Sequence, residues 1–137
     1  MNRILIVDDS RTWLVFHKNT IEQFYGNFFD ITTANSAKEA LNIIKRNCHN
    51  PFDIIITDLQ METDYEPQLA GEWLIEQIKS HNEYIRAHII IISSMYNIEF
   101  IAKKYNTDCI SKNILIRNDL LLKILFEKLM PNLSNLK

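Results

Sequence analysis

The sequence predicts an α/β protein of the flavodoxin-like (βα)5 class: a five-stranded parallel sheet of order 2-1-3-4-5 with helices on both faces. Short apolar runs at residues 4–7, 54–57, 89–92 and, more weakly, 109–111 are the first observation behind this prediction. Continuous runs rich in β-branched residues are typical of parallel strands that are covered on both faces. The second observation is that helical patterns separate the strands, and such alternation implies right-handed crossovers.

The remaining strand is predicted at residues 28–33, where apolar and polar side chains are mixed. Mixed polarity is expected of a strand at the edge of a sheet. An edge strand that comes second in the chain gives the order 2-1-3-4-5. In such a sheet the functional site lies beyond the carboxyl ends of the strands, at the switch point between the first and third.

Helices are predicted at about residues 11–25, 36–44, 74–78, 97–105 and 118–130. Ser36 and Glu39 form a capping box at the start of the second helix, and apolar residues follow at helical spacing. The last helix is rich in leucine and is ended by Pro131. The fourth helix is expected to be short.

Composition restricts both the architecture and the chemistry. A chain of 137 residues predicts one domain spanning 1–137, with its core at about 2–130 and no output domain in this chain. Charged residues make up 23% and the net charge is −2, so we expect no nucleic-acid binding. The two glycines exclude a glycine-rich phosphate loop, and the two cysteines form no CxxC motif. Without a membrane-length apolar run or a signal peptide, the predicted location is cytoplasmic, with no membrane partner.

Polar side chains follow four of the predicted strands at their carboxyl ends. Asp8 and Asp9 follow the first strand, Asp58 the third, Ser93 the fourth and Lys112 the fifth. Three carboxylates at one edge raise each other's pKa unless a cation lies between them. Mg²⁺ is the expected cation, because it is hard, prefers oxygen ligands and leaves room for a phosphate oxygen.

A carboxylate beside a metal can also act as a nucleophile toward phosphorus and form an aspartyl phosphate. The transferred phosphoryl group carries dispersed negative charge, which Mg²⁺ and the Lys112 ammonium would neutralise. Ser93 would donate a hydrogen bond to a phosphoryl oxygen. Other interpretations remain open for single residues: Asp8, Asp9 or Ser10 could cap a helix, and Asp58 could simply end a strand.

These marker positions occur in order in the runs ILIVDDS at 4–10, IIITDLQM at 54–61, IISS at 91–94 and ISK at 110–112. Over nearly its whole length the chain resembles the receiver domain of bacterial two-component response regulators. The resemblance implies that Asp58 is the phosphoacceptor, Ser93 the hydroxyl switch residue and Lys112 the phosphate-binding lysine. It also implies a Mg²⁺ site formed by Asp8, Asp9, Asp58 and the backbone carbonyl of Gln60.

The same resemblance implies a phosphoryl donor and an output. The donor would be a phosphohistidine of a sensor histidine kinase or of a histidine phosphotransfer protein, and the output an unknown downstream protein. In the family the fourth helix, the last strand and the last helix form the output surface. Apolar residues occur on most sides of the first predicted helix, so we expect Trp13 and Phe16 to contact a partner.

The sequence departs from the family pattern at four places, one of which is the short span from Ser93 to Lys112 that predicts the short fourth helix. Asn113 replaces the proline that usually follows the lysine, so we expect a trans peptide bond there and some displacement of Lys112. Cys109 stands at the aromatic switch position. The connection at 62–70 is long and acidic, and is interpreted as a solvated insertion or a surface for a basic partner.

Two other functions are compatible with parts of this pattern. A pseudo-receiver would keep the acidic pocket but act as a protein-binding module independent of phosphorylation, which Asn113 and Cys109 favour. A Mg²⁺-dependent phosphohydrolase of the haloacid dehalogenase type would also use an aspartate nucleophile. That type requires an Asp-x-Asp pair after the first strand, whereas Asp8 and Asp9 are adjacent.

Overall fold

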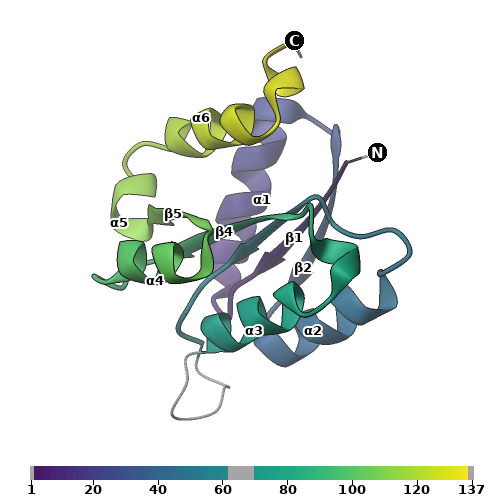
Figure 1. Cartoon of the computed structure of the whole chain (residues 1–137). Helices are drawn as coiled ribbons and strands as arrows, with labels where there is room; N and C mark the ends of the chain where they lie inside the picture. The colour runs from purple at the N-terminus through teal and green to yellow at the C-terminus, as the bar shows by residue number, and fades with distance from the viewer. Residues whose placement is uncertain (1, 62–69, 136–137) are drawn as a thin grey trace.

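The computed structural model describes residues 2–61 and 70–135. Its strands form one parallel sheet of order β2-β1-β3-β4-β5, so the predicted order and fold class are confirmed (Figure 1). The strands are β1 (Asn2–Val7), β2 (Phe29–Ala34), β3 (Ile54–Thr57), β4 (His88–Ser93) and β5 (Asp108–Ser111). Each boundary lies within two residues of the prediction.

Helices cover both faces of the sheet (Figure 1). One face carries α1 (Arg11–Tyr25), α5 (Lys112–Leu115) and α6 (Leu120–Leu129), and the other carries α2 (Ala37–Arg46), α3 (Ala70–Lys79) and α4 (Ile98–Tyr105). Short 3-10 turns, η1 (Asn82–Tyr84) and η2 (Pro131–Asn135), complete the described elements. Among the described residues no helix combines the length and apolar character needed to cross a bilayer.

The core is divided into two layers by the period of the strands. In β1, Leu5 and Val7 pack with α2, α3 and α4, whereas Ile4 and Ile6 pack with α1, α5 and α6. The alternation follows because successive strand side chains point to opposite faces. Both sets are fully buried, which explains why these strands carry no polar alternation.

Serine caps fix where three of the described helices begin. The Ser36 hydroxyl accepts a hydrogen bond from the Glu39 amide at 3.1 Å, as the capping box predicts. The Ser10 hydroxyl accepts one from the Trp13 amide at 3.3 Å, so Ser10 is the N-cap of α1. After β5 the structure differs from the prediction: Ser111 caps a short helix α5 that the sequence patterns did not indicate, and α6 follows it.

Candidate functional site

Three carboxylates converge at the C-terminal edge of the sheet. Asp8 directly follows β1 and Asp58 directly follows β3, and the register pairs Val7 with Thr57, so the two aspartates lie side by side. The Asp58 amide extends this pairing by donating to the Val7 carbonyl at 3.0 Å. Asp8 and Asp58 are buried and Asp9 is half-buried, and one oxygen from each lies within 4.8 Å of the others.

Lys112 contacts two of these three carboxylates. Its ammonium donates to Oδ2 of Asp58 at 2.7 Å and lies 2.9 Å from Oδ2 of Asp8. Only 8% of Lys112 is exposed. The residue begins α5, where the Ser111 hydroxyl accepts from the Asn113 amide at 3.2 Å, so Lys112 reaches Asp58 without a following proline. Lys112 therefore lies at the site, and the trans peptide bond and the displacement expected there stay predictions.

Burial and charge act in opposite directions on the two partners of this ion pair. Burial raises the pKa of Asp8 above its ordinary value, and the nearby charge of Asp58 adds to this, although Lys112 and the Ser10 amide oppose it. Burial by itself would lower the pKa of Lys112, but the hydrogen bond to Asp58 and the close carboxylates of Asp58 and Asp8 together outweigh burial and raise that pKa. Lys112 is therefore a permanent cation among carboxylates, and Asp8 is ionised at a cost.

A divalent cation fits the chemistry of these carboxylates. Oδ2 of Asp8 is fully buried. The Lys112 ammonium is near, but among the described residues no aligned hydrogen bond reaches this oxygen. A buried carboxylate oxygen with an unfilled acceptor position, beside two more carboxylates, is suited to a hard cation. Asp8, Asp9 and Asp58 are the side chains that could hold it. Gln60 is exposed two residues after Asp58, and the role of its carbonyl stays a prediction.

Ser93 ends β4 on the other side of Asp58. β3 pairs Thr57 with Ile91, so Ser93 lies two residues further along the neighbouring strand, toward the site edge. Its side chain is buried, and its hydroxyl oxygen accepts a hydrogen bond from the Met95 amide at 3.2 Å. The hydroxyl proton remains for donation to a ligand.

The second Asp58 oxygen is fixed by the backbone. Oδ1 of Asp58 accepts a hydrogen bond from the Leu59 amide at 2.7 Å, while Oδ2 accepts from Lys112. The two bonds hold the carboxylate in one orientation at the end of β3.

Trp13 lies closer to the site than the sequence indicated. Its ring centroid is 4.9 Å from the Lys112 ammonium nitrogen, and it contacts the rings of Phe16 at 5.1 Å and His17 at 5.4 Å. Trp13 and Phe16 are both half-buried against the core, and their role as partner contacts stays a prediction. The position of Ser10 could have indicated this arrangement, because the third residue after an N-cap beside Asp9 lies on the first turn next to the site.

Cys109 is the departure from the family pattern that packs against the hydrophobic core. Cys109 is half-buried and packs on the α2–α3–α4 side of the core, close in sequence to Tyr105, which packs there too. The acidic connection falls almost wholly on residues 62–69, which lie outside the described residues.

Comparison with known proteins identifies the family. Residues 4–125 match the sequence profile of the response regulator receiver domain. The two-component response regulator ORR26 of Oryza sativa subsp. japonica is 34% identical over 76 residues, which cover 56% of this chain and 12% of that protein. The chain therefore spans about an eighth of the length of this curated relative.

Solved structures of receiver domains have the same fold. The Francisella response regulator 1452 receiver domain is 27% identical, with a TM-score of 0.62 over 91% of this chain and 99% of that one. The signal receiver domain of a DNA-binding response regulator protein (merR) from Colwellia psychrerythraea 34H is 18% identical, with a TM-score of 0.77 over 96% and 99%. Receiver domains generally bind Mg²⁺ at an acidic pocket and interact with sensor histidine kinases or phosphotransfer proteins. This chain belongs to the response regulator receiver domain family.

Proposed function

We propose that this chain is a phosphoacceptor switch of a two-component phosphorelay. In this proposal Asp58 takes a phosphoryl group from a phosphohistidine, with Mg²⁺, and the chain then signals through protein–protein contacts. The single observation that carries the proposal is the buried Lys112 ammonium, which bonds Asp58 and pairs with Asp8 within a cluster of three carboxylates.

The chemistry requires a nucleophile and positive charge at the same point. A carboxylate oxygen of Asp58 attacks phosphorus, the P–N bond of the phosphohistidine breaks, and the imidazole nitrogen leaves with the electron pair. The Lys112 ammonium offsets charge on the phosphoryl oxygens, and the Ser93 hydroxyl donates to one of them. Asp8, Asp9, Asp58 and the Gln60 carbonyl would hold Mg²⁺, which supplies further positive charge to the carboxylates and the transferring group.

The phosphoryl donor is proposed to dock on α1 beside the site. Its protein would be a sensor histidine kinase or a histidine phosphotransfer protein. Trp13 and Phe16 are half-buried there, and Val15 between them is 48% exposed, which provides apolar surface for docking.

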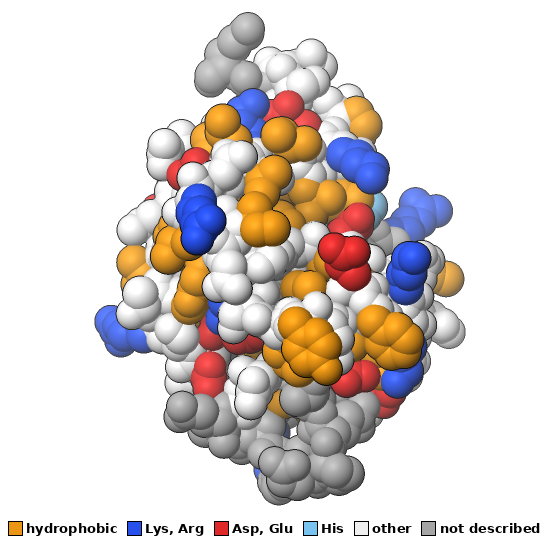
Figure 2. All heavy atoms as spheres, turned by 90° about the vertical axis from the view of Figure 1, so that its left-hand side faces the viewer, with side chains coloured by type: hydrophobic (Ala, Val, Ile, Leu, Met, Phe, Trp, Pro, Cys, Tyr) orange, Lys and Arg blue, Asp and Glu red, His pale blue; other side chains and the backbone are white. Residues whose placement is uncertain are grey.

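The downstream protein is proposed to bind at the β5 edge of the sheet, around α4, β5 and α6. Hydrophobic side chains gather on this face (Figure 2). An apolar groove of about 300 Å³ runs there between α4, α5 and α6, and exposed residues line it or flank it. They include Phe100, Ile114 and Ile124.

Intact mass spectrometry tests the proposed reaction. The protein is incubated with Mg²⁺ and acetyl phosphate beside Asp58→Ala and a matched control, Asp30→Ala, whose carboxylate lies on the edge strand β2. The expected result is a gain of one phosphoryl mass that needs Mg²⁺, is lost in Asp58→Ala and is kept in Asp30→Ala. A phosphoryl gain that survives Asp58→Ala would overturn the assignment of the acceptor.

The alternative is a pseudo-receiver that binds proteins without phosphorylation. The observation that favours it is Cys109, whose small side chain occupies the position of the family's aromatic switch residue. It predicts no phosphoryl gain from acetyl phosphate or from a phosphorylated donor protein, together with no Mg²⁺-induced change in tryptophan fluorescence. Clear Mg²⁺ binding without a gain from acetyl phosphate would instead indicate that the site needs its protein donor.

A further inference from the structure

The indole ring of Trp13 is part of the surroundings of the Lys112 ammonium. Trp13 lies on the first turn of α1, where its amide donates to the Ser10 cap at 3.3 Å. The cap ties the start of α1 to the same loop that carries Asp8, because the Ser10 amide donates to Oδ1 of Asp8 at 2.9 Å. The backbone of Trp13 is therefore tied to the acidic loop by two hydrogen bonds in series.

The Lys112 ammonium has three N–H donors, and three neighbouring groups contact it: the carboxylates of Asp58 and Asp8 and the ring of Trp13. Oxygens of Asp58 and Asp8 lie at 2.7 and 2.9 Å, and the centroid of the Trp13 ring lies at 4.9 Å. A cation within about 6 Å of an indole centroid is attracted by the negative face of the ring, and tryptophan gives the strongest attraction of the aromatic side chains. Burial of Lys112 excludes water that would otherwise screen this attraction.

The neighbouring imidazole of His17 does not supply a second cation to the Trp13 ring. His17 contacts the Trp13 ring at 5.4 Å and is almost completely buried. Burial, with the positive charge of Lys112, lowers the pKa of His17 to about 3, so the imidazole is neutral at physiological pH. Lys112 is therefore the cation that the Trp13 ring stabilises.

We propose that Trp13 is a positioning residue, which holds the Lys112 ammonium at Asp58 through the face of its indole ring. This inference rests on the proposed phosphoacceptor function and assigns Trp13 a role in the site besides docking. Lys112 begins a helix of only four residues and is followed by Asn113, so its own segment restrains the side chain weakly. The contact with Trp13 on α1 adds a second restraint on the position of the ammonium.

Fluorescence of the metal-free protein tests the contact without any reaction. In a Trp73→Phe background Trp13 is the one remaining tryptophan of the chain. Lys112→Met is expected to change the intensity and wavelength of its emission, because a charge beside the ring is removed. The control Lys45→Met, with its charge on α2, is expected to leave the emission unchanged. Equal spectra for Lys112→Met and the parent would overturn the proposal, whether or not the chain is ever phosphorylated.

Phosphorylation rates with acetyl phosphate test the role. Trp13→Leu is expected to slow the reaction roughly tenfold, and Trp13→Phe to slow it by less. Biosynthetic fluorination of Trp13 changes the shape of the ring little, and each added fluorine is expected to slow the reaction further. In a Lys112→Met background Trp13→Leu should have no further effect. Equal slowing in both backgrounds would overturn the positioning role.

The small phosphodonor also separates positioning from docking. It needs no protein interface, so a residue that only docks the donor protein leaves its rate unchanged. Asn19→Ala, at an exposed position of α1 outside the proposed docking surface, is the control and should react with acetyl phosphate at the parent rate. If Trp13→Leu also reacts at the parent rate while transfer from a donor protein falls, Trp13 only docks the partner and the positioning role is wrong. If the parent chain gains no phosphoryl group from acetyl phosphate or from a phosphorylated donor protein, the proposed function fails, and the fluorescence result still decides the contact.

Discussion

Gly71 lies against the backbone of Asp58. A β carbon at Gly71 would be 2.1 Å from the Asp58 carbonyl oxygen and 2.6 Å from the α carbon of Leu59. The Gly71 amide also donates to the Leu59 carbonyl at 3.0 Å. The start of α3 therefore supports the segment that carries the proposed phosphoacceptor, and only glycine permits this approach.

Gly71→Ala is expected to lower the free energy of unfolding by at least about 3 kcal/mol, because backbone atoms cannot rotate out of the way as side chains can. Urea denaturation measures the loss. Gly26→Ala is the matched control: no atom lies within 4 Å of its added β carbon, but its φ of 59° makes alanine strained, at a cost of about 1–3 kcal/mol. A loss at Gly71 no larger than that at Gly26 would contradict the close approach.

Asp8→Asn is expected to stabilise the metal-free protein. The raised pKa of Asp8 means that its ionised form is disfavoured in the folded state, so at neutral pH the charge reduces stability. Asparagine keeps an oxygen for the Ser10 amide and removes the charge. We expect a gain of about 1 kcal/mol, seen as a melting temperature higher by roughly 3–5 °C, and loss of the further rise that Mg²⁺ gives the parent.

The outcome for Asp8→Asn is compared with Asp30→Asn, whose carboxylate is on the edge strand and more than half exposed. That control should change the melting temperature little and keep the response to Mg²⁺. A lower melting temperature in metal-free Asp8→Asn would show that the ion pair with Lys112 outweighs the burial of Asp8.

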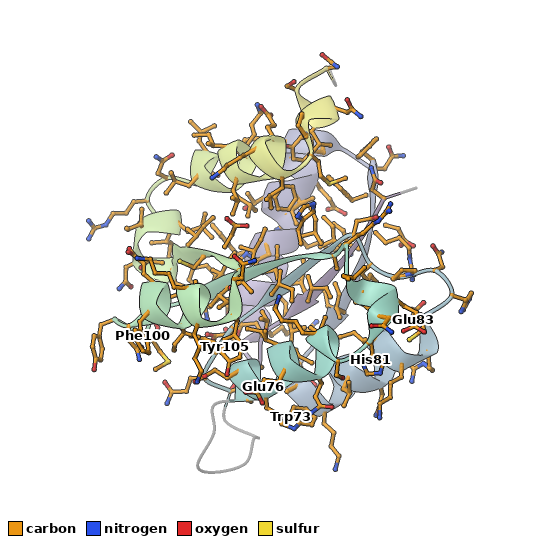
Figure 3. The ribbon with its side chains drawn as sticks, in the orientation of Figure 1. Trp73, Glu76, His81, Glu83, Phe100 and Tyr105 are labelled. Atoms are coloured by element: carbon orange, nitrogen blue, oxygen red, sulfur yellow. The ribbon has the colours of Figure 1, made fainter. Side chains whose placement is uncertain are left out.

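Tyr105→Phe is expected to weaken the contact between α3 and α4. The Tyr105 hydroxyl lies 2.8 Å from Oε2 of Glu76 and 2.9 Å from Oε1 of Glu72, and Figure 3 labels Tyr105 and Glu76 on the neighbouring helices. Burial and these hydrogen bonds raise the pKa of Tyr105, so the hydroxyl keeps its proton and donates it. We expect a loss of about 1 kcal/mol in urea denaturation.

A double-mutant cycle with Glu76→Gln assigns that loss to the contact. The two losses should not add, because each variant removes the same charge-assisted hydrogen bond. Tyr96→Phe, at a residue that is 97% exposed, is the matched control and should leave stability unchanged. Simple additivity of Tyr105→Phe and Glu76→Gln would show that the hydroxyl contributes nothing through Glu76.

Stability is expected to fall as the pH drops below about 6.5, through His17. Its pKa is about 3 in the folded protein, whereas an unfolded histidine takes up a proton at about 6.5. Between these values the unfolded state binds more protons, so the contribution of His17 is complete above pH 6.5 and is lost as pH falls. Between about pH 7 and pH 5 the loss is about 2 kcal/mol, measured by urea denaturation.

Replacement of the buried imidazole isolates this contribution. His17→Leu should lose about 2 kcal/mol less than the parent between those two pH values, because no proton is taken up at this position. His49→Gln, at an exposed position, should keep the pH dependence of the parent. Parallel pH profiles for His17→Leu and the parent would mean that His17 is protonated in the folded state as readily as in the unfolded one.

The sheet and three of its site residues could be predicted from the sequence because their causes are local and periodic. Buried parallel strands appear as continuous β-branched runs, and strand order follows from the polarity of residues 28–33. Once the strands are placed, the residues that follow them share one edge. Asp8, Asp9 and Asp58 are therefore brought together by topology and need no side-chain geometry to be found.

Only the tertiary structure decided how the site is supported. The face of Trp13 beside Lys112, the backbone of Asp58 against Gly71 and the burial of His17 depend on how α1 and α3 pack on the sheet. Such contacts join residues far apart in the chain, and no period or spacing encodes them. The short helix α5 escaped prediction for a related reason, since four residues are too few to show a helical period, and its N-cap at Ser111 is recognised only after β5 has been placed.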